Sequence, residues 1–366
     1  NRAGVIINLM QAQALLSAEE ADFARKNPAQ LSQAAKANAG NYFADWVMQS
    51  GPRFLTQTTT EDVIIKTTFD RRLQNAAEQA MHQVFDSKVR PGSKAQAAIV
   101  VMSPNGAVRA MLGGRNTSVA GGFNRATQAL RQTGSAFKPF VYISAMKEGY
   151  TPSTLILDAP YVVDQGPGLP KWKPSNYTDK FYGLSTMRTG IEKSRNLMTI
   201  RLSDKIGMSK ILETARDFKI DKFMDQSLSM SLGAGEVTLI NLTNAYAMIV
   251  NGGKEIKPNF IVSVNDKRGK QIINNENVIC DNCLQDEENL DYTLPNIYSN
   301  NKTILDSRIA FQITSMLEGV VLRGTGKKLA DLEIPLDNLL LNVSRKARGD
   351  LNRAKRRNIT AKILET

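Results

Sequence analysis

The segment from Phe123 to Gly149 decides the fold, and it reads FNRATQALRQTGSAFKPFVYISAMKEG. A helix pattern begins at Gly134 and Ser135 and ends at Gly149. Pro139 fits the first turn of this helix because the amides there have no helical partner. The pattern predicts a helix with Ser135 at its positive N-terminal end and Lys138, three residues later, on the same face.

A serine followed three residues later by a lysine can act as a nucleophile with its base. A serine hydroxyl attacks a carbonyl when a base takes its proton, and a neutral lysine amine can be that base. The reference pKa of lysine is about 10.4, so half-neutrality at pH 7 requires a shift of about 3 units, or roughly 4 kcal/mol. We expect burial in a cleft, together with a second cation, to supply this shift.

The spacing of serine and lysine is weak by itself, because it recurs at Ser144/Lys147 and at Ser299/Lys302. Ser144 lies nine residues after Ser135, about 180° around the same helix, so the two serines cannot face one cleft. The residues that flank Ser135 give its motif the specificity that the spacing lacks.

These flanking residues resemble a known family. RQTGSAFKP at 131–139, preceded by FNRATQA at 123–129, is similar to the active-site serine motif of class A penicillin-binding proteins. Their superfamily has three motifs, S-x-x-K, S-x-N and K-T-G. A match to the second motif, which runs from Ser194 to Asn196, begins 59 residues after Ser135.

The resemblance implies that Ser135, Lys138 and Ser194 are catalytic. Ser135 would attack the stem peptide, and the Ser194 hydroxyl would relay a proton between Lys138 and the leaving amine. Asn196 would bind substrate by hydrogen-bonding the peptide carbonyl of the donor. The implied function is a peptidoglycan D,D-transpeptidase that β-lactams trap, with no cofactor and no metal site.

The resemblance also implies an α+β fold of the penicillin-binding and β-lactamase type, an antiparallel sheet with helices. We expect this fold to be incomplete at the C-terminus and preceded by a helical remnant. Four parts follow: the C-terminal end of a glycosyltransferase domain at 1–28, a linker region at 29–96, a truncated transpeptidase domain at 97–336 and a divergent basic tail at 337–366.

Local patterns predict several further elements. Residues 1–27 read as helices with a capping box at 17–20, and 97–113 read as a hairpin around a Pro-Asn-Gly turn. Residues 184–202 read as a helix with a break near Gly190. Ser231 to Val250 reads as a glycine turn followed by a buried helix, which we interpret as structural.

The third motif is not found. The 366 residues contain no Lys-Ser-Gly or Lys-Thr-Gly, and Arg188-Thr189-Gly190 precedes the second motif. From about Leu336 the chain stops resembling the family, so we hypothesise that the family's C-terminal part is missing or frameshifted, with plain divergence as the alternative. The 97–113 hairpin would then have an unpaired edge and an uncovered apolar face. We expect little or no acylation, because the motif strand carries one oxyanion-hole amide whose loss costs about 10² to 10³ in rate.

The net charge of +12 favours partners with an anionic surface, such as cell wall or membrane, and no nucleic-acid motif is present. The resemblance implies a location at the periplasmic face of a bacterial inner membrane, with an anchor upstream of residue 1 and a lipid-linked precursor as a partner of the intact family.

Two alternative functions stay open. One is a serine β-lactamase, although no Glu-x-x-Leu-Asn element lies in a suitable place, and the other is a non-catalytic remnant or wall-binding pseudoenzyme.

The remaining features have two interpretations each. Cys280 and Cys283 suit a local disulfide or free thiols, and two ligands are too few for a zinc site.

Four aromatic residues of the 150–183 loop would line a substrate groove or pack the loop onto the domain. They are Trp172, Tyr177, Phe181 and Tyr182.

Overall fold

The computed structural model describes residues 2–27, 41–50, 63–116, 122–164, 167–168, 170–274, 279–281, 296–298 and 301–329. It divides into two compact units that interleave along the chain. Unit 1 comprises Asn1–Gln132, Arg216–Phe223 and Gly235–Leu305, and unit 2 comprises Thr133–Ala215, Met224–Ala234 and Asp306–Thr366. The four parts expected from the resemblance stay a prediction.

The N-terminal helices of unit 1 form where the sequence places them. They are α1 (Arg2–Ala12) and α2 (Ala18–Lys26). Ser17 caps α2, because its hydroxyl accepts from the Glu20 amide at 3.2 Å while the Glu20 carboxylate accepts from the Ser17 amide at 2.8 Å. The capping box is therefore confirmed. No helix in the part of the chain that the structure describes has the length and apolar character to cross a bilayer.

The predicted hairpin in unit 1 is confirmed. Strands β2 (Ile99–Met102) and β3 (Val108–Leu112) pair antiparallel, with Ile99 opposite Leu112 and Val100 opposite Met111. Paired residues share a face, so Ile99 and Leu112 lie on one side and Val100 and Met111 on the other. Among the described residues the hairpin forms a two-stranded sheet.

The expectation of an uncovered apolar face on this hairpin is wrong. Leu112 packs with Ala77, Met81 and Phe85 of helix α6 (Arg71–Lys88). On the other face, Met111 belongs to a core cluster with aromatic residues of α4 (Asn41–Ser50) and with Ile240 of α11 (Leu239–Val250). Helices therefore cover both faces of the hairpin.

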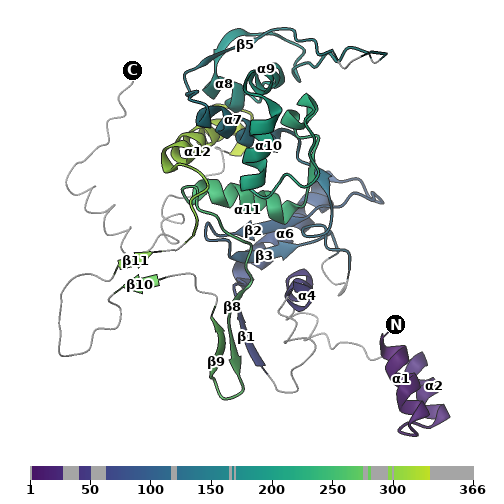
Figure 1. Ribbon diagram of the computed structural model, residues 1–366. Helices are drawn as coiled ribbons and strands as arrows, with labels where there is room; N and C mark the ends of the chain where they lie inside the picture. The colour runs from purple at the N-terminus through teal and green to yellow at the C-terminus, as the bar shows by residue number, and fades with distance from the viewer. Residues whose placement is uncertain are drawn as a thin grey trace, which may run out of the picture. The chain divides into compact units, whose positions relative to one another are not determined.

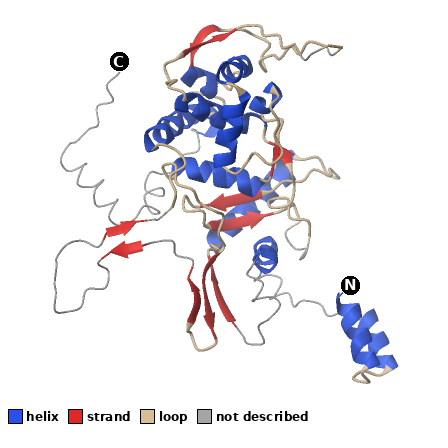
Figure 2. Ribbon diagram, in the orientation of Figure 1, coloured by secondary structure: helices blue, strands red, loops and turns tan. Residues whose placement is uncertain are grey.

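A second sheet of unit 1 has the order β1-β8-β9, and all of its pairs are antiparallel (Figure 2). Its strands are β1 (Val63–Thr67), β8 (Ile261–Asp266) and β9 (Gln271–Asn274). Two short pairs complete the described strands of the unit. They are β4 (Arg131–Gln132) with β7 (Glu236–Val237), and β10 (Ile279–Asp281) with β11 (Asn296–Tyr298). Cys283 lies outside the described residues, so the cysteine prediction is not tested.

Unit 2 is built around helix α7 (Lys138–Lys147), whose residues from Lys138 to Met146 are all buried. Helices α8 (Met187–Glu192), α9 (Asn196–Ile206) and α12 (Ser307–Leu322) pack against it (Figure 1). Helix α10 (Met208–Asp217) follows α9, and its last residues belong to unit 1. Ser144 is buried within α7 whereas Ser135 is exposed, which agrees with their predicted opposite faces.

The helix expected from Leu184 to Leu202 is partly wrong. Strand β6 (Gly183–Thr186) pairs with β5 (Leu155–Asp158), and α8 starts only where the Thr186 hydroxyl accepts from the Thr189 amide. Gly190 lies inside α8, and a Cβ there would lie 2.6 Å from the Tyr142 hydroxyl, so close packing explains this glycine. The break falls later, between α8 and α9.

Candidate active site

The nucleophile turn of unit 2, named for the predicted role of Ser135, is η1 (Gly134–Phe137), a 3-10 helix that leads directly into α7. The predicted single helix therefore has a tighter first turn. Ser135 is exposed on this turn, whereas the Lys138 side chain is buried to 1% exposure. The turn thus presents a hydroxyl to solvent and keeps the amine beneath it.

Lys138 makes three hydrogen bonds, one for each N–H of an ammonium. Its Nζ donates to the Ser194 carbonyl at 2.7 Å, to Ser194 Oγ at 3.0 Å and to Asn196 Oδ1 at 2.7 Å. An ammonium has three donors and no acceptor, so this set satisfies it completely. These three contacts match the three donors of a protonated amine.

Ser194 connects the lysine to the exposed serine. Its hydroxyl donates to Ser135 Oγ at 3.0 Å and accepts from Lys138 at 3.0 Å. The structure thus brings together all four predicted site residues, Ser135, Lys138, Ser194 and Asn196. Their roles in a reaction stay a prediction.

Burial lowers the pKa of Lys138 from 10.5 to about 8. Removal from water disfavours the charged form of an amine, which is the expected physical cause. The shift has the direction that a base requires. Burial produces it without the second cation that the sequence interpretation invoked.

The turn that carries Ser194 is strained. Ser194 has a backbone φ of +54°, in the left-handed region that residues other than glycine rarely adopt. Such a backbone costs of order 1–3 kcal/mol and persists only where its surroundings hold it. Two hydrogen bonds close the turn, from the Ser194 amide to the Ile191 carbonyl at 3.0 Å and from the Arg195 amide to the Gly190 carbonyl at 2.8 Å.

Gly233 supports the nucleophile turn, a role that the sequence interpretation missed. Its carbonyl accepts from the Gly134 amide at 3.0 Å, directly before Ser135. Gly233 has φ +84°, and a Cβ there would lie 2.0 Å from the Gly134 carbonyl oxygen. The Gly-Ala-Gly sequence at 233–235 was the only hint of this role in the sequence. Its glycines allow a turn, and Gly233 also allows the backbone of Gly134 to approach closely.

Asn196 already has partners at both ends of its amide. Its Oδ1 accepts from Lys138, and its Nδ2 donates to the Ser175 carbonyl at 2.9 Å. One N–H of the amide is left for a substrate carbonyl, so the predicted binding role is compatible with this geometry. The residue that holds Asn196 in place, Asn176, was also missed from the sequence.

The aromatic residues of the loop before β6 differ in their surroundings. The Tyr182 ring lies 3.3 Å from the Arg195 guanidinium carbon, whereas Tyr177 is fully exposed. Phe181 is 52% exposed. Tyr182 thus contacts the unit through Arg195 although it is 44% exposed, whereas Tyr177 is not packed. The groove prediction stays untested.

The turn after α12 is tied to the same site. Glu192, buried to 5% exposure at the end of α8, accepts from Arg323 at 2.5 Å, and its carbonyl accepts from the Thr325 amide at 3.1 Å. The chain after Gly326 therefore starts close to the second motif. Residues 330–366, which include the predicted tail and the place expected for a third motif, lie outside the described residues.

Comparison with known proteins identifies a family from the sequence and the same fold in solved structures. Residues 97–336 match the family described as "Penicillin binding protein transpeptidase domain". Penicillin-binding protein 1A of Rickettsia bellii (strain RML369-C) is 44% identical over 230 residues, 62% of this chain and 29% of the relative. Penicillin-binding protein 2D of Bacillus subtilis (strain 168) is 29% identical over 328 residues, 87% of this chain and 44% of the relative. The chain thus spans less than half of the length of these curated relatives.

Two solved structures share the fold. Penicillin-binding protein 1A from Haemophilus influenzae aligns with a TM-score of 0.69 at 21% identity, over 90% of this chain and 65% of that one. The PonA1 protein from Mycobacterium tuberculosis, in complex with penicillin V, aligns with a TM-score of 0.62 at 22% identity, over 77% of this chain and 72% of that one. The α+β transpeptidase fold expected from the sequence is confirmed.

Proposed function

Because the chain belongs to the penicillin-binding protein transpeptidase family, we propose that it is part of a peptidoglycan D,D-transpeptidase that works through an acyl-Ser135 intermediate. Ser135 Oγ attacks the carbonyl carbon of the penultimate D-Ala of a stem peptide. The C–N bond to the terminal D-Ala breaks, and the leaving amine takes a proton. A neighbouring stem amine then attacks the ester, the new amide forms, and Ser135 regains its proton.

One observation carries this proposal, the connection of an exposed hydroxyl to a buried amine through a single hydroxyl. Ser194 Oγ lies 3.0 Å from Ser135 Oγ and 3.0 Å from Lys138 Nζ. When Lys138 is neutral, the Ser135 proton passes to Ser194 while the Ser194 proton passes to the amine. The same path in reverse delivers a proton to the leaving group, as general acid–base catalysis requires.

The start of α7 favours the negative charge that develops on Ser135. The nucleophile lies at the N-terminal end of consecutive helical turns, where backbone N–H groups lack helical partners. The Ser135 carbonyl accepts from the Lys138 amide, so the turn that holds the nucleophile is itself hydrogen-bonded. This arrangement stabilises an alkoxide without movement during the reaction.

The finer parts of the proposal follow from family membership. We propose β-lactams as substrate mimics that acylate Ser135, and residues 1–28 as the end of a glycosyltransferase domain. In the whole protein the partners would be stem peptides and a lipid-linked glycan precursor at the periplasmic face of the inner membrane. Relatives that are much longer than this chain are the basis for this part.

The rate of acylation of this chain is expected to be low. The 366 residues contain no Lys-Ser-Gly or Lys-Thr-Gly sequence, whose strand would supply one of the oxyanion-hole amides. Loss of one such donor costs about 10² to 10³ in rate. We therefore propose slow, stoichiometric acylation.

Incubation of the 366-residue chain with a fluorescent penicillin over hours, followed by intact mass and peptide mapping, tests the proposal. We expect one adduct on Ser135, absent from Ser135→Ala. Ser144→Ala is the matched control, because it alters a buried serine with the same spacing to a lysine and should keep the adduct.

The other outcomes separate the alternatives. No adduct on a folded chain would favour the non-catalytic remnant, and fast turnover of nitrocefin would favour a serine β-lactamase. Labelling as fast as that of a complete penicillin-binding protein would keep the function and remove the expected rate loss.

A further inference from the structure

The turn that presents the second motif depends on a residue from a different segment. The backbone at Ser194 is strained, and Arg195, at the N-cap position of α9, makes no capping hydrogen bond with its side chain. The first amides of a helix need partners, and an uncapped buried helix start is unusual. Another side chain must therefore supply the cap.

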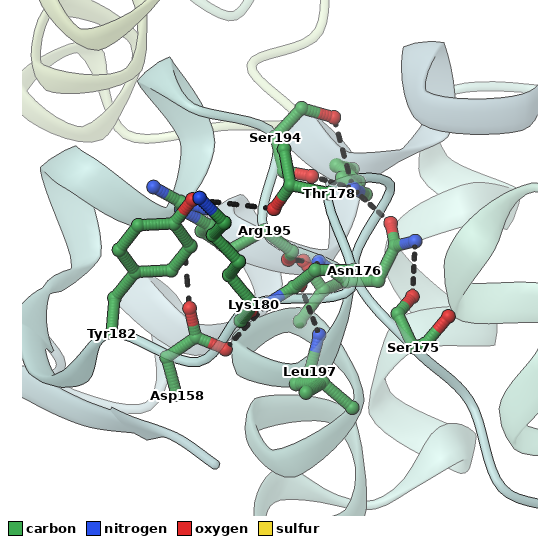
Figure 3. Close-up of polar contacts among 12 residues, drawn as sticks. Asp158, Ser175, Asn176, Thr178, Lys180, Tyr182, Ser194, Arg195 and Leu197 are labelled. Atoms are coloured by element: carbon green, nitrogen blue, oxygen red, sulfur yellow. Dashed lines mark hydrogen bonds and ion pairs between the residues drawn. The ribbon is translucent and has the colours of Figure 1, made fainter. Parts of the chain in front are cut away.

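Asn176 supplies it. Its Oδ1 accepts from the Asn196 amide at 2.9 Å and from the Leu197 amide at 3.3 Å, which are the first two amides of α9. Figure 3 labels Asn176 and Leu197. The Asn176 side chain reaches these amides from 20 residues upstream, and the residue is 3% exposed. It therefore fixes the backbone position of Asn196, whose Oδ1 accepts from Lys138.

The orientation of the Asn176 amide is dictated from both ends. Its Nδ2 donates to Asp158 Oδ1 at 2.8 Å and to the Lys180 carbonyl at 2.9 Å (Figure 3). Both of these partners are acceptors, whereas the α9 amides are donors, so only one orientation satisfies all four bonds. Asp158 is fully buried, and its Oδ1 accepts from Asn176 while its Oδ2, which has no hydrogen-bond partner among the described residues, lies 3.9 Å from Arg195 Nε.

We infer that Asn176, held by Asp158, is a positioning residue that sets Asn196 and Ser194 around Lys138. It touches neither Ser135 nor Lys138 in the contacts described, and it acts through the start of α9. The inference deepens the proposed transpeptidase function and rests on it for its effect on acylation. Its effect on Lys138 is separate, because the burial of that amine can be measured without any reaction at Ser135.

Two single substitutions at Asn176, and one double variant that exchanges the residues at 158 and 176, test this inference. Asn176→Ala removes the cap. Asn176→Asp places a second carboxylate against Asp158, where the two would repel. In the double variant Asn176→Asp with Asp158→Asn, an aspartate caps α9 and accepts from the new amide at 158, so the bond between 158 and 176 is kept with donor and acceptor exchanged, while the bond to the Lys180 carbonyl is lost. Asn244→Ala is the matched control, because this buried asparagine of α11 in unit 1 donates to the Ile256 carbonyl and contacts no site residue in the bonds described.

Two readouts are taken on each folded variant. The first is the pH dependence of Lys138 reactivity toward acetic anhydride, followed by mass spectrometry. The second is the rate of acylation by a fluorescent penicillin across the same pH range. We expect the Lys138 midpoint to rise by about one unit in both single variants as water enters, and acylation to fall roughly 10- to 100-fold.

We expect the double variant to recover part of both values, because it keeps the cap and the bond between 158 and 176 and loses the bond to the Lys180 carbonyl. We expect Asn244→Ala to leave the Lys138 midpoint unchanged even where it lowers the melting temperature. If both single variants fold and titrate like the parent chain, the inference is overturned. If they fail to fold, the double variant decides, because a Lys138 midpoint as high as that of a solvated lysine in that folded variant, despite the restored cap, also overturns the inference. If the parent chain is never acylated, the proposed function fails while the Lys138 titration still decides the role of Asn176.

Discussion

Replacing Gly233 by alanine should disable the nucleophile turn without unfolding unit 2. The new Cβ would lie 2.0 Å from the Gly134 carbonyl oxygen and 2.5 Å from the Gly134 nitrogen. Both atoms belong to the backbone and cannot rotate away. Contacts of a Cβ shorter than 3.0 Å are essentially never seen, so the turn before Ser135 must move by about 1 Å.

The magnitude of the effect has two parts. An alanine in the left-handed region costs about 1–2 kcal/mol of stability, and Gly233 has φ +84°. A displacement of about 1 Å at a reacting group costs about 10² in rate. We therefore expect acylation by a fluorescent penicillin to fall about 100-fold in Gly233→Ala.

The variant Gly149→Ala separates the effect of backbone strain from the effect of the steric clash. Gly149 has φ +86° and open space where a Cβ would lie, so this variant has the same backbone strain without the clash. It should lose similar stability and keep the parent acylation rate. Rates are measured by gel fluorescence against time, and stability is measured by thermal unfolding. Equal acylation rates in the two variants would refute the claim that Gly233 positions Ser135.

Three further predictions concern the same site. Acylation should rise about tenfold per pH unit and level off above pH 8, because the proposed base is neutral Lys138 and burial lowers its pKa to about 8; an inflection near pH 10 in a stopped-time labelling series would contradict this. Ser194→Ala should lower the acylation rate by about 10² to 10⁴, because it removes the hydroxyl that connects base and nucleophile; unchanged labelling would show that protons take another path. Glu192→Gln should lower the melting temperature, because it weakens a buried partner of Arg323, whereas Glu148→Gln, in an exposed ion pair, should leave it unchanged; equal melting temperatures of the two variants would argue against the Arg323 contact.

The sequence predicted features that depend on neighbours along the chain. The spacing of Ser135 and Lys138 on one helical face, the capping box at Ser17 and the 97–113 hairpin are local consequences of helix period, side-chain capping and turn chemistry. The start of α7 still differs in detail, because η1 tightens its first turn. Local patterns also misread Gly190, whose small size serves packing against Tyr142.

The place of Ser194 in the site could be predicted from the sequence only through the resemblance. A gap of 59 residues carries no local signal for a 3.0 Å contact with Ser135. The contact forms because α9 packs against α7 and the strained turn before α9 aims its hydroxyl at the start of α7. Helix packing of this kind depends on surfaces far apart in sequence.

By itself, the sequence determined the family, the spacing of Ser135 and Lys138 on one helical turn, and the absence of a Lys-Thr-Gly motif from the 366 residues. Only the tertiary structure decided that Gly233 supports the nucleophile turn and that Asn176 caps α9. The physical reason is that helix period and turn chemistry act between neighbours in the chain. A backbone contact or a cap supplied from a distant segment exists only after the chain has packed, and its partners leave no periodic pattern to read.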